Sequence, residues 1–195
     1  MDRTLRCRCG ALRGVLQTSP ECTRLVCYCK DCQAFARYLG DPGDILDALG
    51  GSDVVGVHPQ QLRLTEGREQ LACMSLSDKG MLRWYARCCL TPIGNTARSP
   101  AIAYVGLLHT CIDTGAASFD EAFGPVRLKS MVKSAKGKVD ASGVAALPTL
   151  LGFAGKLLRA RLSGSYRRTP FFGADGAPVV APTVLTPAER GALAG

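Results

Sequence analysis

Three cysteines, Cys27, Cys29 and Cys32, lie within a single run of six residues. This run, here called the triplet, has the pattern C-x-C-x-x-C, which places three thiol groups on one short stretch of chain and is hard to explain as core packing. Zinc binds thiolates of this kind, and a zinc ion with only three protein ligands keeps an open position for water or a substrate. The triplet therefore predicts a metal site with room for chemistry, and any fold of this chain must hold its sulfurs together.

The remaining cysteines strengthen the metal interpretation. The chain has 10 cysteines in 195 residues, and Cys7 and Cys9 form a second close pair, while Cys88 and Cys89 are adjacent. A disulfide framework and an iron-sulfur cluster are the alternatives, because thiolates alone do not select the metal. The opening residues 1–6 contain no apolar run typical of a secretory signal, so we expect a cytoplasmic protein with reduced thiols.

Composition predicts a soluble globular protein. A hydrophobic content of 47% over 195 residues is enough to bury one sizeable core. The longest apolar stretches, residues 101–108 and 145–151, are much shorter than the roughly 18–20 residues that a membrane-spanning helix needs. We therefore expect no membrane span.

Charge and cysteine content divide the chain near residue 118. Residues 1–118 carry 13 Lys and Arg against 11 Asp and Glu and contain every cysteine, the last being Cys111. Residues 119–195 carry 11 basic against 5 acidic residues and have no cysteine. The sequence thus predicts a zinc-binding β domain over 1–118, followed by a basic, helical and partly extended segment over 119–195.

Short alternating apolar segments, separated by turn residues, favour a mainly β fold. Residues 31–39 could form one or two helical turns after the triplet. Regularly spaced strands of this length are typical of a β-sandwich. The strand candidates are residues 7–16 as a hairpin, 24–29, 54–64, 70–76, 82–87 and 101–108.

The order of the cysteine motifs resembles that of the glutathione-dependent formaldehyde-activating family, which includes the centromere protein V type. The resemblance covers about residues 5–114. It implies a zinc-binding, β-sandwich-like fold with a four-cysteine structural site and a triplet site beside a pocket for a glutathione adduct. The residues that carry it are Cys7, Cys9, Gly10, Cys27, Cys29, Cys32, Cys89, Thr91 and Pro92.

The third motif departs from the family pattern. The family usually has C-x-x-C-G before Thr-Pro, and the first of those cysteines falls on Ala86 in this chain. Cys88 can take its place only if the chain turns there, because neighbouring residues of an extended strand point to opposite faces. We predict Cys7, Cys9 and Cys89 as ligands of the structural site, with Cys88 as the fourth. A three-coordinate or vacant site is the alternative.

The chemistry expected at the triplet follows from charge. A divalent zinc ion and three thiolates have a net charge of −1, and metal coordination still keeps a cosubstrate thiol in its nucleophilic thiolate form. The resemblance implies that the triplet is the catalytic centre, where a glutathione-like thiol attacks formaldehyde or another small carbonyl. Three nearby cations are candidate ligands for the carboxylates of such a thiol, although plain surface charge also explains them: Arg24, Lys30 and Arg37.

The C-terminal segment suggests a second class of function. Residues 147–162 predict an amphipathic helix with Lys156, Arg159 and Arg161 towards its end, where cations complement the helix dipole. Basic residues also precede and follow it, a pattern that suits a nucleic-acid or acidic-membrane partner. The alternative is that the helix packs on the sandwich or on a second subunit. The rival to the enzyme is therefore a non-catalytic zinc module whose basic segment binds nucleic acid or a protein.

Overall fold

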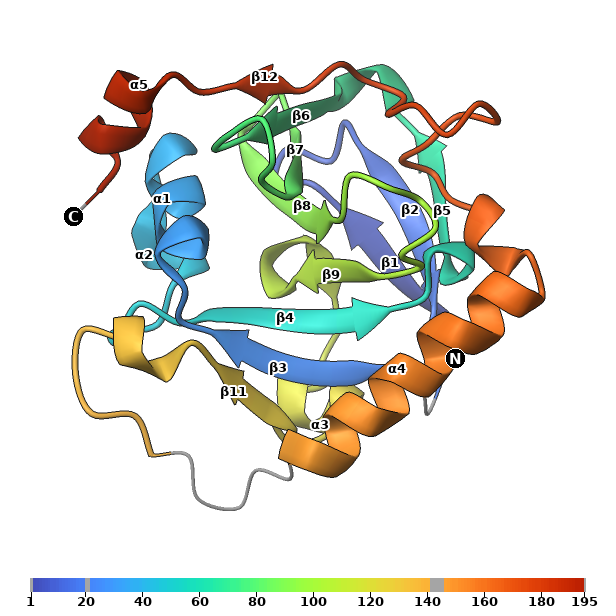
Figure 1. Cartoon of the computed structure of the whole chain (residues 1–195), viewed down its shortest axis with the longest axis horizontal. Coiled ribbons are helices and arrows are strands. Elements are labelled where there is room, and N and C mark those ends of the chain that lie inside the picture. The colour runs from blue at the N-terminus through green and yellow to red at the C-terminus, as the bar shows by residue number, and fades with distance from the viewer. Residues whose placement is uncertain (1, 20–21, 141–145, 195) are drawn as a thin grey trace.

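The chain forms two packed β-sheets with helices on the outer surface of the larger one (Figure 1). The computed structural model describes residues 2–19, 22–140 and 146–194. The smaller sheet consists of β1 (Asp2–Arg6), β2 (Arg13–Gln17), β5 (Leu62–Glu66) and β10 (Ile112–Asp113), in the spatial order β10-β1-β2-β5.

The larger sheet has eight strands within the described residues. They are β3 (Thr23–Cys27), β4 (Ser52–Val57), β6 (Leu71–Ser75), β7 (Leu82–Ala86), β8 (Thr91–Thr96), β9 (Val105–Leu108), β11 (Leu128–Ser130) and β12 (Thr183–Val184). Their spatial order is β11-β3-β4-β9-β8-β7-β6-β12. All neighbours are antiparallel except β11 with β3 and β12 with β6, which are parallel.

Helices connect and cover these strands. The α-helices are α1 (Lys30–Tyr38), α2 (Pro42–Ile45), α3 (Phe119–Phe123), α4 (Ala146–Leu162) and α5 (Pro187–Ala192). Short 3-10 turns are η1 (Pro59–Gln61), η2 (Arg68–Gln70), η3 (His109–Cys111), η4 (Val132–Ser134) and η5 (Ser165–Arg167). None of the helices in the described ranges is long and apolar enough to cross a membrane.

The main core lies between the two sheets. Alternate residues of each strand point into it, as the period of two requires. Trp84 of β7 is fully buried there, and its indole nitrogen donates to the hydroxyl of Thr96, 3.0 Å away. Leucines and valines of both sheets surround it: Leu5, Leu12, Leu16, Val55, Val57, Leu62, Leu71, Leu82, Val105 and Leu107.

A second, smaller core forms where α1 and α2 cover the outer surface of the large sheet. Phe35 and Leu39 of α1 pack with Ile45 of α2, Met74 of β6 and Leu185. This packing holds α1 against β6 and β7, so the first turn of α1 lies beside the end of β3 (Figure 1). The triplet is located at that junction.

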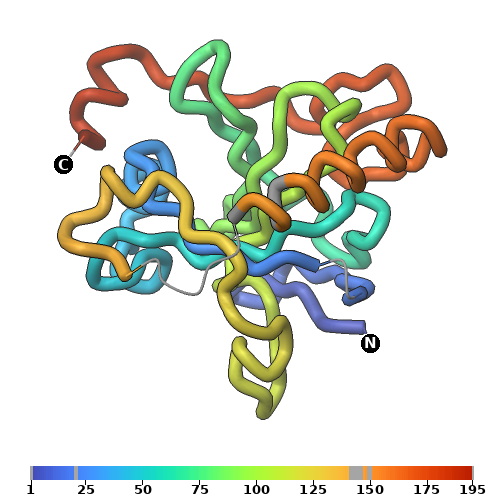
Figure 2. Tube along the Cα trace, turned by 60° about the horizontal axis from the view of Figure 1, so that its bottom comes forward, coloured from blue at the N-terminus to red at the C-terminus, as the bar shows by residue number. Residues whose placement is uncertain are grey.

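The segment over 119–195 joins the rest of the molecule closely. Its strands β11 and β12 extend the two edges of the large sheet. The Phe171 ring lies 4.9 Å from the Trp84 ring, measured between centroids, inside the main core. Figure 2 shows the orange helix α4 lying across the outer surface of the molecule, away from the projecting turn that contains α3. The division near residue 118 is thus one of charge and cysteine content, and the domain boundary predicted there stays a prediction.

The mainly β class is confirmed, and the helices expected over 31–39 and 147–162 are present as α1 and α4. The single strand expected over 54–64 is wrong, because η1 interrupts it at Pro59 and sends β4 and β5 to different sheets. Strand β8 has the sequence TPIGNT, whose Pro, Gly and Asn are poor strand formers. Pairing with β7 and β9 on both sides overrides this weak local preference.

Candidate metal centres

The first centre is a quartet of thiols, Cys7, Cys9, Cys88 and Cys89, whose sulfur atoms all lie within 4.8 Å of one another. The Cys7 sulfur is 3.6 Å from that of Cys9 and 3.7 Å from that of Cys88, and the Cys9 and Cys88 sulfurs are 3.4 Å apart. Tetrahedral zinc with Zn–S bonds of about 2.3 Å separates its sulfurs by about 3.8 Å. The quartet therefore fits a closed four-thiolate metal site.

Two tight turns create the quartet. In the first, Gly10 adopts a left-handed conformation with φ of 77°, and the amide of Leu12 donates to the Cys7 sulfur over 3.3 Å. The second turn joins β7 to β8, and Leu90 completes it with a positive φ of 56°. Because Cys88 and Cys89 are in this turn and not in an extended strand, both thiols face the same centre. The turn therefore allows Cys88 to act as the predicted fourth ligand of the quartet.

Thr91 ties the two turns together. Its hydroxyl accepts from the amide of Arg8 at 2.9 Å and lies 3.1 Å from the Cys89 sulfur. Burial by itself would raise the pKa of Cys89, but hydrogen bonds from Thr91 and Cys9 outweigh it and lower the pKa to about 6. Cys89 thus supplies the quartet with a thiolate that can bind a cation.

The second centre is the triplet, whose three sulfurs also lie within 4.8 Å of one another. Cys27 ends β3, and Cys29 caps the N-terminus of α1, where its sulfur accepts from the amide of Cys32 at 3.3 Å. Amides at a helix N-terminus stabilise thiolates. The neighbouring thiols of Cys29 and Cys32 donate to Cys27 and hold its pKa well below its usual range. The C-x-C-x-x-C spacing therefore brings the three thiols together locally, at the junction between β3 and α1.

Arg83 of β7 is a buried cation beside the triplet that sequence reasoning missed. Its side chain is only 3% exposed, and its Nη1 lies 3.8 Å from the Cys32 sulfur and 3.2 Å from Oδ1 of Asn95. The guanidinium also stacks over the Phe35 ring at 5.4 Å. The only sequence signal is an arginine in the apolar run Leu82–Ala86, on the strand face opposite Trp84. An arginine held here places a positive charge against the Cys32 sulfur, and its Nη2 also lies 3.8 Å from Oδ2 of Asp31.

Sheet register brings Ser130 to the triplet. Ser130 of β11 pairs with Cys27, and its hydroxyl hydrogen-bonds the Cys27 sulfur. Ser130 is distant from the triplet in sequence and reaches it only through strand pairing. Burial raises the pKa of Tyr104, and the charges of Cys27 and Cys32 add to this effect from a distance, because Tyr104 lies over Gly56, which pairs with the opposite end of β3.

The three cations predicted to bind the carboxylates of a thiol lie in different environments. Arg24 is mostly buried, pairs with Asp53 at 2.7 Å and with Asp120, and stacks over Phe119, so its charge is already compensated. Arg37 is at the far end of α1, where its Nη1 donates to the carbonyl of Leu193 at 2.7 Å. Lys30, the first residue of α1, is exposed next to the triplet. Of the three, only Lys30 combines exposure with proximity to the triplet.

The fold and the two cysteine groups define a mainly β protein with two centres that could hold metal ions. Residues 2–182 match the family of unknown function DUF6151, and the chain belongs to that family. No curated protein matches the chain. A crystal structure of a Rhodobacter sphaeroides protein is 17% identical, with a TM-score of 0.43, and the match covers 67% of this chain and 100% of that one.

Proposed function

We propose that the triplet binds zinc with an open coordination position and that the protein makes or breaks carbon-sulfur bonds in the adduct of a thiol with formaldehyde or another small carbonyl. The observation that carries this proposal is the contrast between the two centres. Within the described ranges, four thiols converge in the quartet and three in the triplet. Closed four-ligand sites are structural, whereas three-ligand sites leave a position for a reactant.

The residues around the triplet suit this chemistry. Zinc bound there would supply positive charge that keeps an incoming thiol deprotonated. Arg83 would reduce the surplus negative charge of three metal-bound thiolates, although it shares its own charge with Asp31, and so would ease the approach of a further anionic sulfur. Lys30 offers an exposed charge at the rim for a carboxylate of the thiol. The similarity of the motifs to the formaldehyde-activating family supports glutathione as the thiol.

The proposed reaction balances without an external oxidant or reductant. The thiolate sulfur attacks the carbonyl carbon and forms a C–S bond, while the C=O π electrons move to oxygen, which takes a proton from solvent. The reverse reaction breaks the C–S bond and releases the carbonyl compound. Free thiols and formaldehyde also react without a catalyst. Catalysis is therefore detected as a reaction rate above that uncatalysed background.

Cobalt substitution tests the open position directly. We expect protein loaded with Co²⁺ to show thiolate-to-metal absorption that changes on titration with glutathione, and we expect this change to disappear in C29S. The matched variant C9S, which alters the quartet, should keep it. Exchange NMR of glutathione with ¹³C-formaldehyde then measures acceleration by the zinc protein. A spectrum that glutathione does not alter, together with no acceleration, would leave two structural metal sites and refute the enzyme.

A specific feature of α4 favours a second candidate function, binding to an acidic membrane surface. Leu147, Leu151, Leu158 and Leu162 are 59–79% exposed, and their spacing places them on one side of the helix. The helix has cations, including Arg161, and no acidic residue. A second copy of α4 would oppose like charges, whereas an anionic lipid surface complements them and also buries the leucines. Nucleic acid would complement the charge and leave the leucines in water.

Vesicle sedimentation separates these partners. We expect the chain to sediment with vesicles of phosphatidylglycerol and phosphatidylcholine, and not with phosphatidylcholine alone. The variant L151D/L158D should lose most of this binding. A change at Leu76, such as L76D, cannot serve as the control because Leu76 is buried. R63M, an exposed change on β5, is the matched control. Binding of duplex DNA that L151D/L158D leaves unchanged, without vesicle binding, would instead support the nucleic-acid alternative.

A further inference from the structure

A large cavity lies between α4 and the outer surface of the large sheet, separate from both cysteine centres. Its volume is about 1290 Å³. Typical pockets for small organic ligands have volumes of roughly 300–1,000 Å³. Its lining comes from several elements, among them β3, β4, η1, α4 and η5, and it includes none of the seven cysteines of the quartet and the triplet. A cavity of this size is large enough for a ligand of its own.

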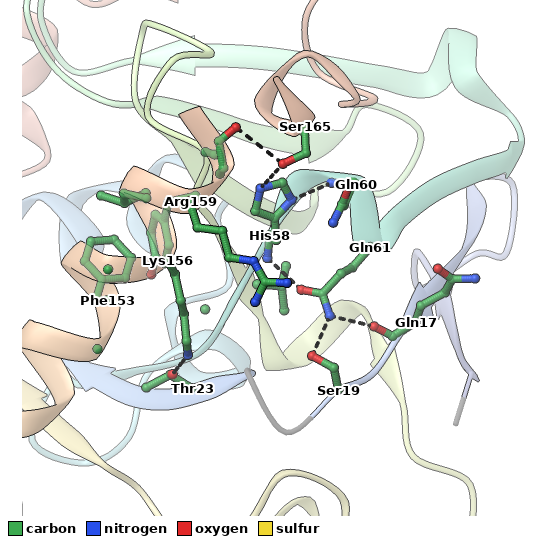
Figure 3. Close-up of a pocket in the computed structure, with 18 of the residues that line it drawn as sticks. Gln17, Ser19, Thr23, His58, Gln60, Gln61, Phe153, Lys156, Arg159 and Ser165 are labelled. Carbon is green, nitrogen blue, oxygen red and sulfur yellow. Dashed lines mark hydrogen bonds between the residues drawn. The ribbon is translucent and has the colours of Figure 1, made fainter. Parts of the chain in front are cut away.

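One wall of the cavity is polar and firmly held. The side-chain amide of Gln61 donates to the carbonyl of Gln17 at 2.9 Å and to the hydroxyl of Ser19 at 3.0 Å, and its oxygen accepts from the amide of His58 at 2.8 Å. Nε2 of His58 lies 3.3 Å from the hydroxyl of Ser165, a contact that joins η1 to η5, the turn that follows α4. Figure 3 shows this chain of contacts along one side of the cavity. These hydrogen bonds fix the wall before any ligand arrives.

Cations gather against this wall. Lys156, Arg159 and Arg168 line the cavity. The ammonium of Lys156 lies 3.4 Å from the hydroxyl of Thr23 on β3. In Figure 3 the guanidinium of Arg159 extends between Lys156 and Gln61. Two cations of α4 thus extend into the same cavity, which suits the recognition of an anionic group.

The opposite part of the cavity is apolar. Phe153 of α4 meets Tyr104 edge to face, with ring centroids 5.1 Å apart. Tyr104 lies over Gly56 of β4 and Gly106 of β9, where any side chain larger than hydrogen would collide with its ring. Leu25 and Leu157 also line the cavity. The two glycines therefore make room for an aromatic floor under α4.

We propose that this cavity binds a small organic anion with an apolar part, such as a medium-chain carboxylate or an alkyl phosphate ester. The anionic group contacts Lys156 and Arg159. The apolar part packs against Phe153 and Tyr104. This site is independent of the metal chemistry proposed for the triplet, because it shares no ligand residue with either cysteine centre.

A fluorescent aromatic sulfonate, 8-anilinonaphthalene-1-sulfonate, is the probe for this site. We expect saturable binding to the full-length zinc-loaded protein, weakened about tenfold or more in K156M/R159M, because each lost charge-assisted contact is substantial. R161M is the matched control, since Arg161 is exposed on the same helix and does not line the cavity. L151D/L158D must also retain binding, which excludes the exposed leucines as the site of the probe.

Competition identifies the ligand class. Decanoate and decyl phosphate should displace the probe, inorganic phosphate should displace it only weakly, and decanol should not displace it at comparable concentration. Equal displacement by decanol, or unchanged affinity in K156M/R159M, overturns the proposal. Should that double variant fail to fold by circular dichroism, protection of Lys156 from acetylation by saturating decanoate decides in its place. Acetylation of Lys156 at the same rate with and without decanoate would also overturn it.

Discussion

Nη1 of Arg83 lies 3.8 Å from the sulfur of Cys32, inside the protein and out of contact with water. A buried charge is costly unless an opposite charge compensates it. A divalent ion bound by three thiolates would leave a surplus of one negative charge, and Arg83 would face it while its Nη2 also lies 3.8 Å from Oδ2 of the exposed Asp31. The triplet and Arg83 therefore form one electrostatic unit, although they come from different parts of the chain.

The first prediction concerns that unit. We expect R83M to weaken zinc binding at the triplet by roughly 10- to 100-fold, the range seen when residues that contact metal ligands are changed. R83K should restore part of the affinity, because it returns the charge without the planar contacts. Competition with a chromogenic chelator measures the affinity. R63M on β5 is the control, and equal affinities in R83M and R63M would remove Arg83 from the site.

The second prediction concerns the quartet as a structural site. We expect C9S to lose one zinc per chain and to lower Tm by about 5 °C or more, because binding energy at a closed site contributes directly to folding. C22S is the matched control, since Cys22 belongs to neither centre. Elemental analysis and thermal melts provide both readouts. A C9S protein that keeps its zinc and its Tm would show that the quartet holds no metal.

The third prediction concerns thiol reactivity. Burial raises the pKa of both Cys73 and Cys111 to about 12, so both thiols stay protonated and unreactive at pH 8. We expect iodoacetamide to leave them unmodified in the folded zinc protein, and to modify the exposed Cys9 and Cys88 only after the metal is removed. Mass spectrometry of the digested protein locates the labels. Rapid labelling of Cys9 before chelation would contradict a metal-bound quartet.

The fourth prediction concerns the union of the C-terminal segment with the main core. Phe171 packs against Trp84, the only tryptophan of the chain. We expect F171A to destabilise the protein by about 3–5 kcal/mol, as for other buried phenylalanines, and to shift the emission of Trp84 to longer wavelength. Urea unfolding followed by fluorescence measures both effects.

The matched control for F171A is L158A, which truncates a largely exposed leucine of the same segment. It should change the free energy of unfolding by less than about 0.5 kcal/mol, the usual range for surface substitutions. Equal stability of F171A and L158A would mean that Phe171 contributes little to the main core.

Several features of this protein follow from local sequence. The spacing of Cys27, Cys29 and Cys32 brings three thiols together wherever a strand leads into a helix, because that junction spans only a few residues. Cys7 and Cys9 are close because one residue separates them in the chain, and Cys88 and Cys89 are close because they are neighbours. The helix over 147–162 also follows from residues that are neighbours in the chain. Such features depend on interactions between residues near in sequence, so pattern and spacing predict them.

Other features depend on the tertiary structure alone. The turn at Leu90 makes Cys88 available as the fourth thiol of the quartet, and strand pairing brings Ser130 to the triplet. The packing of α1 on the large sheet brings Arg83 to Cys32, and the packing of α4 forms a cavity with Lys156 and Arg159 on its wall. Pairing between distant strands and the fit of a helix over a sheet depend on how the whole core is filled. No local pattern of apolar and polar residues specifies them. The cysteine spacing therefore determined what each centre could bind, and the packing of the two sheets decided which charges and cavities surround it.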